Sequence, residues 1–200
     1  MSEFELHKYS GMAYESNQII TFSQTPSIAL PDIDEEMKHH VGVAAVEVCN
    51  LTQEEFDYFI CKYGDNFESI YFFGNPKVKD LSALSKLKNV KYLLFWGMRA
   101  NSLWDMTENE NLLGIMISES KKLIYNLELL QFAPSLEELL LFSSTFNKYP
   151  VKTISPLRNC KKLKRLFINF NTEDKSFSPE DFYFLDVFKY QCDRKRNFTY

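Results

Sequence analysis

Residues of the types that most often carry out chemistry are sparse in this chain, which has 3 His, 4 Cys and 6 Gly among 200 residues. One group could bind a metal ion, since imidazole and carboxylate are both zinc ligands. It consists of His39 and His40 and the preceding acids Asp32, Asp34, Glu35 and Glu36. Adjacent residues on a strand or helix point apart, and no third ligand has a suitable spacing. We therefore expect a solvated acidic segment and no metal site.

Catalytic and phosphate-binding motifs are missing from the sequence. It contains no Gly-rich phosphate loop, no GxSxG sequence and no Cys–His pair arranged for nucleophilic attack. An active site would have to rest on carboxylates alone, and no spacing indicates one. The sequence predicts a protein that is not an enzyme and uses no cofactor.

Basic residues gather near the C-terminal end, where they could contact phosphates. They are Arg158, Lys161, Lys162, Lys164, Arg165 and the tail Arg194–Arg196. No recognition residues are interleaved with them, and the net charge of −4 argues against a nucleic-acid partner. We interpret these residues as a solvated edge.

The elements that position the remaining side chains follow from a recurring phrase, apolar-x-x-apolar-x-apolar. Its first apolar residues are at positions 43, 67, 90, 112, 136 and 163, so the steps are 24, 23, 22, 24 and 27 residues. A fixed period in the twenties indicates a solenoid, in which each unit buries its apolar face against its neighbours. Between the phrases, apolar residues recur every third position, as at Val78, Leu81, Leu84 and Leu87, which suits a 3-10 helix.

The stretch from Val78 to Leu93 resembles the 22-residue class of leucine-rich repeat found in phosphatase-regulator-type and internalin-type proteins. The stretch from Val151 to Ile168 repeats it, and the resemblance covers about residues 43–171. It implies an α/β solenoid with short parallel inner strands and 3-10 or irregular outer segments. The family's turn asparagine is present as Asn75 and Asn171 only, so the turn ladder is incomplete. The family binds many partners, so the resemblance implies little about function.

The expected domain organisation has three parts. Residues 1–40 form an N-terminal cap with short strands near 4–9 and 18–23; residues 41–174 hold about six repeats; residues 175–200 form a C-terminal capping helix and tail. A capping box at Thr52–Glu55 predicts an α-helix up to Gly64. A second N-cap at Ser178 predicts the capping helix, through Phe182, Leu185 and Phe188 towards Tyr190. A protruding loop is expected at 145–150.

Two rows of residues should lie on the concave face, the sheet face turned away from the outer segments. The first concave row is Glu47, Tyr71, Leu94, Met116, Leu140 and Phe167, and the second is Cys49, Phe73, Trp96, Ser118, Phe142 and Asn169. Most of these are large and apolar, and exposed apolar patches usually mark interaction sites. The predicted partner-binding residues are Tyr71, Phe73, Tyr92, Leu94, Trp96, Met116, Leu140, Phe142 and Phe167.

Three occupants of that face are compatible with the sequence. The first is another protein, the second is another copy of the chain in a homodimer, and the third is a segment of the chain itself, either residues 1–40 or the 145–150 loop. We favour a protein partner, because aromatic residues and Met are enriched in interface cores.

Compartment is indicated by the termini and the cysteines. The start of the chain lacks the basic and apolar regions of a signal peptide, and no apolar run approaches the roughly 18 residues of a membrane span. Cys49, Cys61, Cys160 and Cys192 have no paired spacing, so we expect thiols. These features favour a cytoplasmic, bacterial protein over the alternative, an internalin-like surface adhesin.

Overall fold

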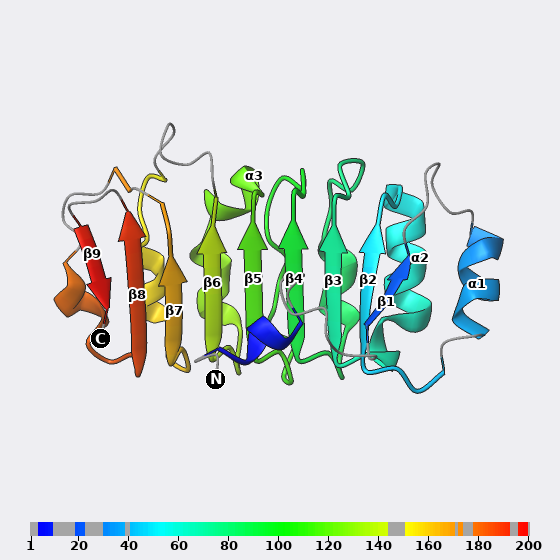
Figure 1. The fold of residues 1–200 in the computed structure, drawn as a ribbon, viewed down its shortest axis with the longest axis horizontal. Helices are drawn as coiled ribbons and strands as arrows, with labels where there is room; N and C mark the ends of the chain where they lie inside the picture. Colours follow the sequence, from blue (N-terminus) through cyan, green and yellow to red (C-terminus); the bar gives the residue numbers. More distant parts are fainter. Residues whose placement is uncertain are drawn as a thin grey trace.

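The computed structural model describes residues 4–9, 19–22, 30–38, 41–143, 151–170, 172–173, 178–192 and 196–199. Its centre is a single sheet of nine strands that lie side by side in chain order, β1 to β9 (Figure 1). The strands are β1 Ile19–Phe22, β2 Ala45–Cys49, β3 Ser69–Phe73, β4 Tyr92–Trp96, β5 Gly114–Ser118, β6 Glu138–Phe142, β7 Arg165–Ile168, β8 Val187–Cys192 and β9 Arg196–Thr199.

All strand pairs are parallel up to β8, and β9 runs antiparallel to β8 at the C-terminal end of the sheet. Parallel neighbours in strict chain order require one crossover per strand, which is the architecture of a leucine-rich-repeat solenoid. The fold predicted from the repeat is therefore confirmed. β1 pairs with β2, so the strand expected near residues 18–23 extends the solenoid sheet.

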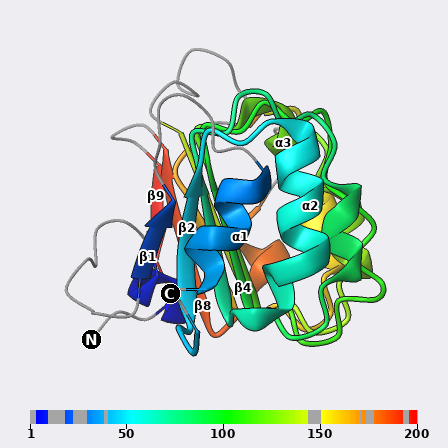
Figure 2. The same ribbon diagram turned by 90° about the vertical axis from the view of Figure 1, so that its right-hand side faces the viewer.

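The crossovers form a second layer on one face of the sheet (Figure 2). This layer holds the helices α1 Leu30–Lys38, α2 Gln53–Tyr63 and α3 Lys121–Ile124 and the 3-10 helices η2 Gly64–Asn66, η3 Ser82–Lys86, η4 Glu128–Phe132, η5 Ser155–Asn159 and η6 Pro179–Phe182. A further 3-10 helix, η1 Glu5–Lys8, lies on the opposite face. η3, η4 and η5 confirm the prediction from apolar residues at every third position. Val78, Leu81, Leu84 and Leu87 are all buried, because eclipsed i and i+3 side chains point at the sheet together.

The strand register is the predicted one. Leu93, Leu139 and Leu166 are buried in the core between the sheet and the outer segments. On the opposite face, Tyr71 pairs with Leu94, Leu94 with Met116, Met116 with Leu140 and Leu140 with Phe167. The first concave row is thus a continuous line of cross-strand neighbours.

α2 begins as the capping box predicts. Thr52 Oγ1 accepts the Glu55 N–H at 3.3 Å, and Glu55 Oε2 accepts the Thr52 N–H at 2.7 Å. Phe56, Phe59 and Ile60 then bury one face of the helix, and Gly64 is its C-cap. The exposed end of α2 is joined to α1 by Asp34, whose carboxylate accepts hydrogen bonds from the Tyr58 and Tyr63 hydroxyls and from Lys62 Nζ.

The turns that follow the strands repeat one backbone conformation. Asn50, Gly74, Gly97 and Glu119 all have φ between 51° and 66°, in the left-handed region. One residue further on, Asn75 Oδ1 accepts the N–H of Leu51 in the preceding repeat at 2.9 Å, and Ser120 Oγ accepts that of Met98 at 2.9 Å. Ser120 therefore supplies one missing rung of the asparagine ladder. Asn171 lies outside the described residues.

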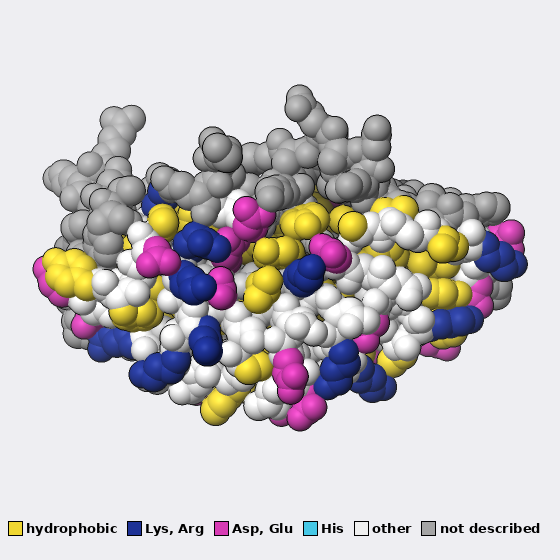
Figure 3. Space-filling model, turned by 90° about the horizontal axis from the view of Figure 1, so that it is seen from below, with side chains coloured by type: hydrophobic (Ala, Val, Ile, Leu, Met, Phe, Trp, Pro, Cys, Tyr) yellow, Lys and Arg dark blue, Asp and Glu magenta, His cyan; other side chains and the backbone are white. Residues whose placement is uncertain are grey.

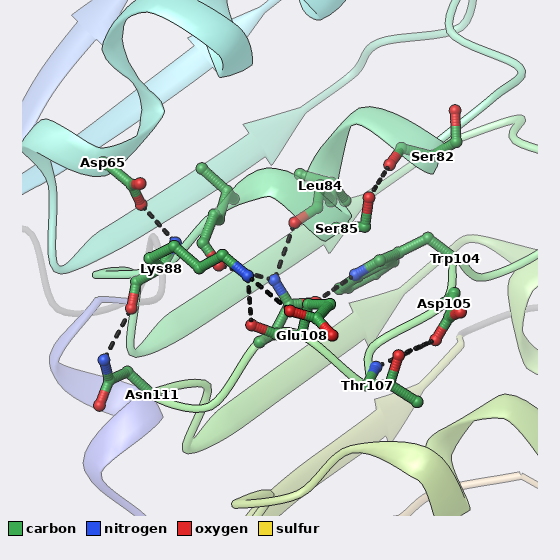
Figure 4. A network of polar contacts seen from close by, with 12 residues as sticks. Asp65, Ser82, Leu84, Ser85, Lys88, Trp104, Asp105, Thr107, Glu108 and Asn111 are labelled. Carbon is green, nitrogen blue, oxygen red and sulfur yellow. Dashed lines mark hydrogen bonds and ion pairs between the residues drawn. The ribbon is translucent and has the colours of Figure 1, made fainter.

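The repeat between β4 and β5 has no helix in its outer segment and is held by Asn109 instead. Figure 4 labels two of the partners of Asn109, Leu84 and Trp104. The buried Asn109 side-chain amide donates to the carbonyl oxygens of Leu84 and Leu87 at 2.9 and 2.8 Å. Its Oδ1 accepts the Trp104 indole N–H at 2.8 Å. The Asn109 amide thus provides hydrogen-bond donors for carbonyl groups at the C-terminal end of η3. This role explains why a polar residue stands at position 109, where the repeat would otherwise have an apolar one.

The predicted C-terminal capping helix is wrong. The capping box at Ser178 opens only the short η6, and the segment around Phe188 and Tyr190 is strand β8. Leu185, Phe188 and Tyr190 form one more copy of the apolar-x-x-apolar-x-apolar phrase, 22 residues after Leu163. Pairing with β7 therefore outweighs the helix-start signal. The division of the chain at residues 40 and 174 stays a prediction.

Candidate binding surface on the concave face

The N-terminal segment, residues 4–9, lies on the concave face of the sheet. Figure 1 shows its dark blue turn, η1, in front of β5, and Figure 2 shows it on the side of the sheet opposite α2. Residues 4–9 were predicted to be strand-like, and that prediction is wrong: Glu5–Lys8 is a 3-10 helix. An intramolecular cover was the third of the occupants that the sequence left open.

The N-terminal segment buries some of the predicted partner-binding residues and leaves others partly exposed. Phe4 and Leu6 form a second apolar core with four residues of the first concave row, all of them buried: Tyr71, Leu94, Met116 and Leu140. The sequence placed those four side chains on an exposed patch. They lie inside the protein because a short apolar segment from the chain's own start packs on them. Tyr92, Phe142 and Phe167 are half-buried at the margin of this core.

The backbone of the segment is held by one buried carboxylate. Glu138 in β6 is only 1% exposed. Its Oε2 accepts the Leu6 N–H at 3.0 Å, and its Oε1 accepts the Glu5 N–H at 3.1 Å. Arg165 in β7 donates to Oε1 from Nε and Nη2 at 2.7 and 2.6 Å. A buried charge is tolerated when it is both paired and hydrogen-bonded, and the first turn of η1 supplies the donors that complete this set.

The shape of the sheet also fits the segment. Gly114 is the one glycine in β2–β7, and a Cβ there would stand 2.9 Å from Leu6 Cγ and 2.8 Å from Tyr92 Cδ1. The missing side chain at Gly114 leaves the space that Leu6 fills. Tyr9 stacks on Tyr92 with ring centroids 5.2 Å apart. Burial, with a smaller effect of the nearby Glu138 carboxylate, raises the pKa of the Tyr92 hydroxyl to about 12.

Sequence reasoning missed Phe4, Leu6, Gly114 and Glu138 as residues of this surface. Two of these residues, Gly114 and Glu138, could have been recognised from the sequence. A glycine within a strand often marks a close approach of another backbone. A carboxylate at the same row as Tyr92, beside an otherwise apolar patch, indicates a local set of donors.

The second concave row keeps an exposed part. Phe73 and Trp96 are each 38% exposed, and their rings stack with centroids 4.4 Å apart and an interplanar angle of 10°. Ser118 follows Trp96 in the row, and then Phe142, which contacts Phe167 edge-on at 5.3 Å. Exposed and half-buried aromatic rings thus continue along the ends of the strands beyond the area that residues 4–9 cover.

A shallow hollow lies at the turn after β4, and its lining includes the residue after Trp96 in the chain. It has a volume of about 370 Å³ and is lined by Gly97, Met98, Glu119 and four cations, Lys79, Arg99, Lys121 and Lys122. Gly97 follows Trp96 directly, so the hollow and the aromatic pair share one edge of the sheet. The surroundings are cationic although the whole chain has a net charge of −4.

A buried polar pair lies at the other end of the rows, in β2. The Cys49 thiol donates to Glu47 Oε1 across 3.6 Å, and both side chains are buried next to Tyr71. Burial raises the pKa of Glu47 and, more strongly, that of Tyr71. The pair forms part of the wall of the second core.

In the described part of the chain, no three His, Cys, Asp or Glu side chains are grouped so that they could hold a metal ion. The expectation about His39 and His40 falls outside the described residues. Among those residues there is also no helix of the length and apolarity that crossing a bilayer requires. Cys49, Cys61 and Cys160 are thiols.

Fold and surface together define a solenoid of leucine-rich-repeat architecture with a partly covered concave face. No family model matches its sequence, and no curated protein matches it. Among solved structures it is similar to an internalin, InlF, from Listeria monocytogenes, with 17% sequence identity and a TM-score of 0.48. The match covers 70% of this chain and 39% of the internalin chain, so this chain spans well under half of that protein's length.

Proposed function

We propose that this protein is a binding scaffold that recognises another protein through the exposed part of its concave face. The observation that carries the proposal is the Phe73–Trp96 pair, two large stacked rings that are each 38% exposed beside a largely buried first concave row. Central aromatic residues dominate the binding energy of protein interfaces. Phe142 and Phe167 extend this surface, and Tyr71, Leu94, Met116 and Leu140 lie beside it in the first concave row.

The partner that fits this surface presents an apolar side chain flanked by carboxylates. The apolar group would pack on Phe73 and Trp96, and the carboxylates would face Lys79, Arg99, Lys121 and Lys122 around the hollow at the turn after β4. Complementary charge of this kind increases the association rate and specificity more than the affinity.

Capture from native lysate with matched variants tests the proposal. The wild type and Phe132→Asp should capture the same protein, because Phe132 is a similarly exposed aromatic residue on η4, in the outer layer. Trp96→Asp should lose it, and Arg99→Glu should weaken it. Equal capture by Trp96→Asp and Phe132→Asp would place the binding surface elsewhere.

We also propose a cytoplasmic location and a binding role without catalysis. The support for the location is the chemistry of the cysteines, since Cys49 and Cys160 are buried thiols in a well-packed core. Thiol counting on the denatured native protein tests this point. Four reactive thiols are expected, and two disulfides would favour the surface-adhesin alternative.

A further inference from the structure

The area beneath residues 4–9 has the features of a peptide-binding site rather than of an ordinary core. Its polar contacts with the segment go to backbone N–H groups, through a carboxylate that belongs to the sheet. Its apolar contacts are made by two side chains two positions apart, Phe4 and Leu6, whereas Glu5 between them is exposed. Peptide sites combine fixed partners for the main chain with pockets for single side chains, and this area has both: Glu138 accepts the N–H groups, and the space over Gly114 holds Leu6.

The sheet contributes all the fixed parts of this site. Gly114 provides the space for one apolar side chain, and Arg165 holds the Glu138 carboxylate in place from the neighbouring strand. These residues lie on three adjacent strands, β5, β6 and β7, so their positions are set by the solenoid and not by the segment. We therefore expect the site to keep its geometry when the segment leaves.

The segment itself is short, and its attachment to the chain favours its binding. Linkage makes docking intramolecular, with an effective concentration on the order of millimolar for a short connection. A small contact area then suffices to keep the site occupied. A partner segment with more contacts, including those to Phe73 and Trp96, can compete with it.

We propose that the concave face holds a peptide site, built from Tyr92, Gly114, Met116, Glu138 and Arg165, that residues 4–9 occupy as a displaceable internal ligand. The external ligand is a turn of a partner protein with the pattern apolar-x-Leu. Its first two N–H groups bind Glu138, and its leucine lies over Gly114. Displacement uncovers Tyr71, Leu94, Met116 and Leu140, which join the exposed aromatic pair in one surface. This inference extends the proposed function to the regulation of the same face.

The direct test uses an acetylated peptide with the sequence of residues 2–10, Ser-Glu-Phe-Glu-Leu-His-Lys-Tyr-Ser, and the full-length protein. Leu6→Asp should release the internal segment and leave the site open. The peptide should bind this variant saturably and should bind the wild type about tenfold more weakly or less, because the internal segment competes. The same peptide with Asp in place of its Leu should bind neither protein. No binding to the Leu6→Asp variant, or equal binding of both peptides, would overturn the proposal.

A measurement on the wild type covers the case in which Leu6→Asp does not fold. Hydrogen exchange should show the Leu6 amide opening locally, roughly a hundredfold faster than the protected amides of β6. Exchange of Leu6 only through global unfolding would make the segment an integral part of the core and would overturn the proposal. A concentration-dependent dimer in sedimentation that Leu6→Asp abolishes would also overturn it, since the segment would then exchange between copies.

The two proposals can fail separately. Loss of capture by Trp96→Asp together with no peptide binding would retain the scaffold and reject the internal ligand. Peptide binding together with unaltered capture by Trp96→Asp would retain the internal ligand and reject the Phe73–Trp96 surface as the scaffold's binding site.

Discussion

Leu6 lies so close to Gly114 that a β-carbon on the glycine would stand 2.9 Å from Leu6 Cγ. The two residues are 108 positions apart in the chain. Their contact joins the N-terminal segment to the middle of the sheet. It determines which residues of the predicted binding patch are buried and which remain exposed to solvent.

Gly114→Ala should loosen the N-terminal segment. The added methyl group also meets Tyr92 Cδ1 at 2.8 Å, so we expect a loss of about 1–3 kcal/mol in the free energy of unfolding, typical of overpacking. Faster exchange of the Leu6 amide should accompany the loss. Gly74→Ala is the control: nothing lies within 4 Å of its new Cβ, and its positive φ alone should cost about 1–2 kcal/mol. Unchanged Leu6 exchange in Gly114→Ala would contradict the close contact.

Double-mutant cycles should separate the two cores. Leu6→Ala and Met116→Ala remove groups from the same core, so their effects on unfolding free energy should deviate from additivity by about 0.5 kcal/mol or more. Leu139→Ala should cost about 2–5 kcal/mol and should add to Leu6→Ala within about 0.5 kcal/mol, because Leu139 lies in the other core. Denaturant melts provide the values. Strong coupling between Leu6 and Leu139 would mean that the sheet does not separate the cores.

Neighbouring aromatic residues in β4 provide a test of the register. Phe95 is fully buried and Trp96 is 38% exposed. Phe95→Ser should cost at least the roughly 3–5 kcal/mol of a large-to-small core substitution. Trp96→Ser should cost about 1 kcal/mol or less, mostly from lost stacking on Phe73. Similar thermal melts for the two variants would mean that the strand faces are assigned incorrectly.

Removal of the Asn109 amide should destabilise the irregular repeat. Asn109→Ala leaves the Leu87 carbonyl and the Trp104 indole N–H without this partner, whereas the Leu84 carbonyl still accepts the Leu87 N–H at 3.1 Å. Each unsatisfied buried group costs about 1–3 kcal/mol. We expect a loss of about 2 kcal/mol or more in total. Asn111→Ala is the matched control, since its single bond to Lys88 is exposed and should be worth about 0.5 kcal/mol or less (Figure 4). Equal denaturant midpoints for the two variants would rule out a structural role for Asn109.

The link between α1 and α2 should depend on pH only in strong acid. Hydrogen bonds from Lys62, Tyr63 and Tyr58 lower the pKa of Asp34 from 3.8 to about 2. Because the folded-state pKa is below the unfolded value, the contribution is complete above pH 3.8 and is lost as the pH falls through 2. An NMR titration of the carboxyl group should give this pKa, and Lys62→Met should move it towards 3.8. An unaltered pKa in Lys62→Met would show that Lys62 is not its main cause.

Charged side chains at the N-terminal ends of the strands require no functional explanation. Lys91 pairs with Glu68 at 3.1 Å and Lys164 with Glu137 at 2.7 Å, each across adjacent repeats. Figure 3 shows this edge from below, with cationic and anionic side chains interspersed. The basic cluster around Lys164 is thus partly neutralised by the neighbouring repeat, as expected for a solvated edge.

Local patterns in the sequence determined most of the fold. The phrase apolar-x-x-apolar-x-apolar fixes which strand side chains face the outer segments, because a shift by one residue would exchange the two faces. The spacing of Val78, Leu81, Leu84 and Leu87 likewise determined the packing of η3, since both depend on neighbours within one repeat. The same phrase is present at Leu185, Phe188 and Tyr190, but the helix-start signal at Ser178 led to the prediction of a helix in place of strand β8.

Tertiary structure alone decided what covers the concave face. The apolar residues Tyr71, Leu94, Met116 and Leu140 have the same pattern whether a partner, a second copy or the chain itself packs on them. The pairing of Glu138 with the Glu5 and Leu6 N–H groups joins positions more than 130 residues apart. No local propensity encodes such a contact, because its free energy depends on a carboxylate, a glycine and a segment that only the folded solenoid brings together.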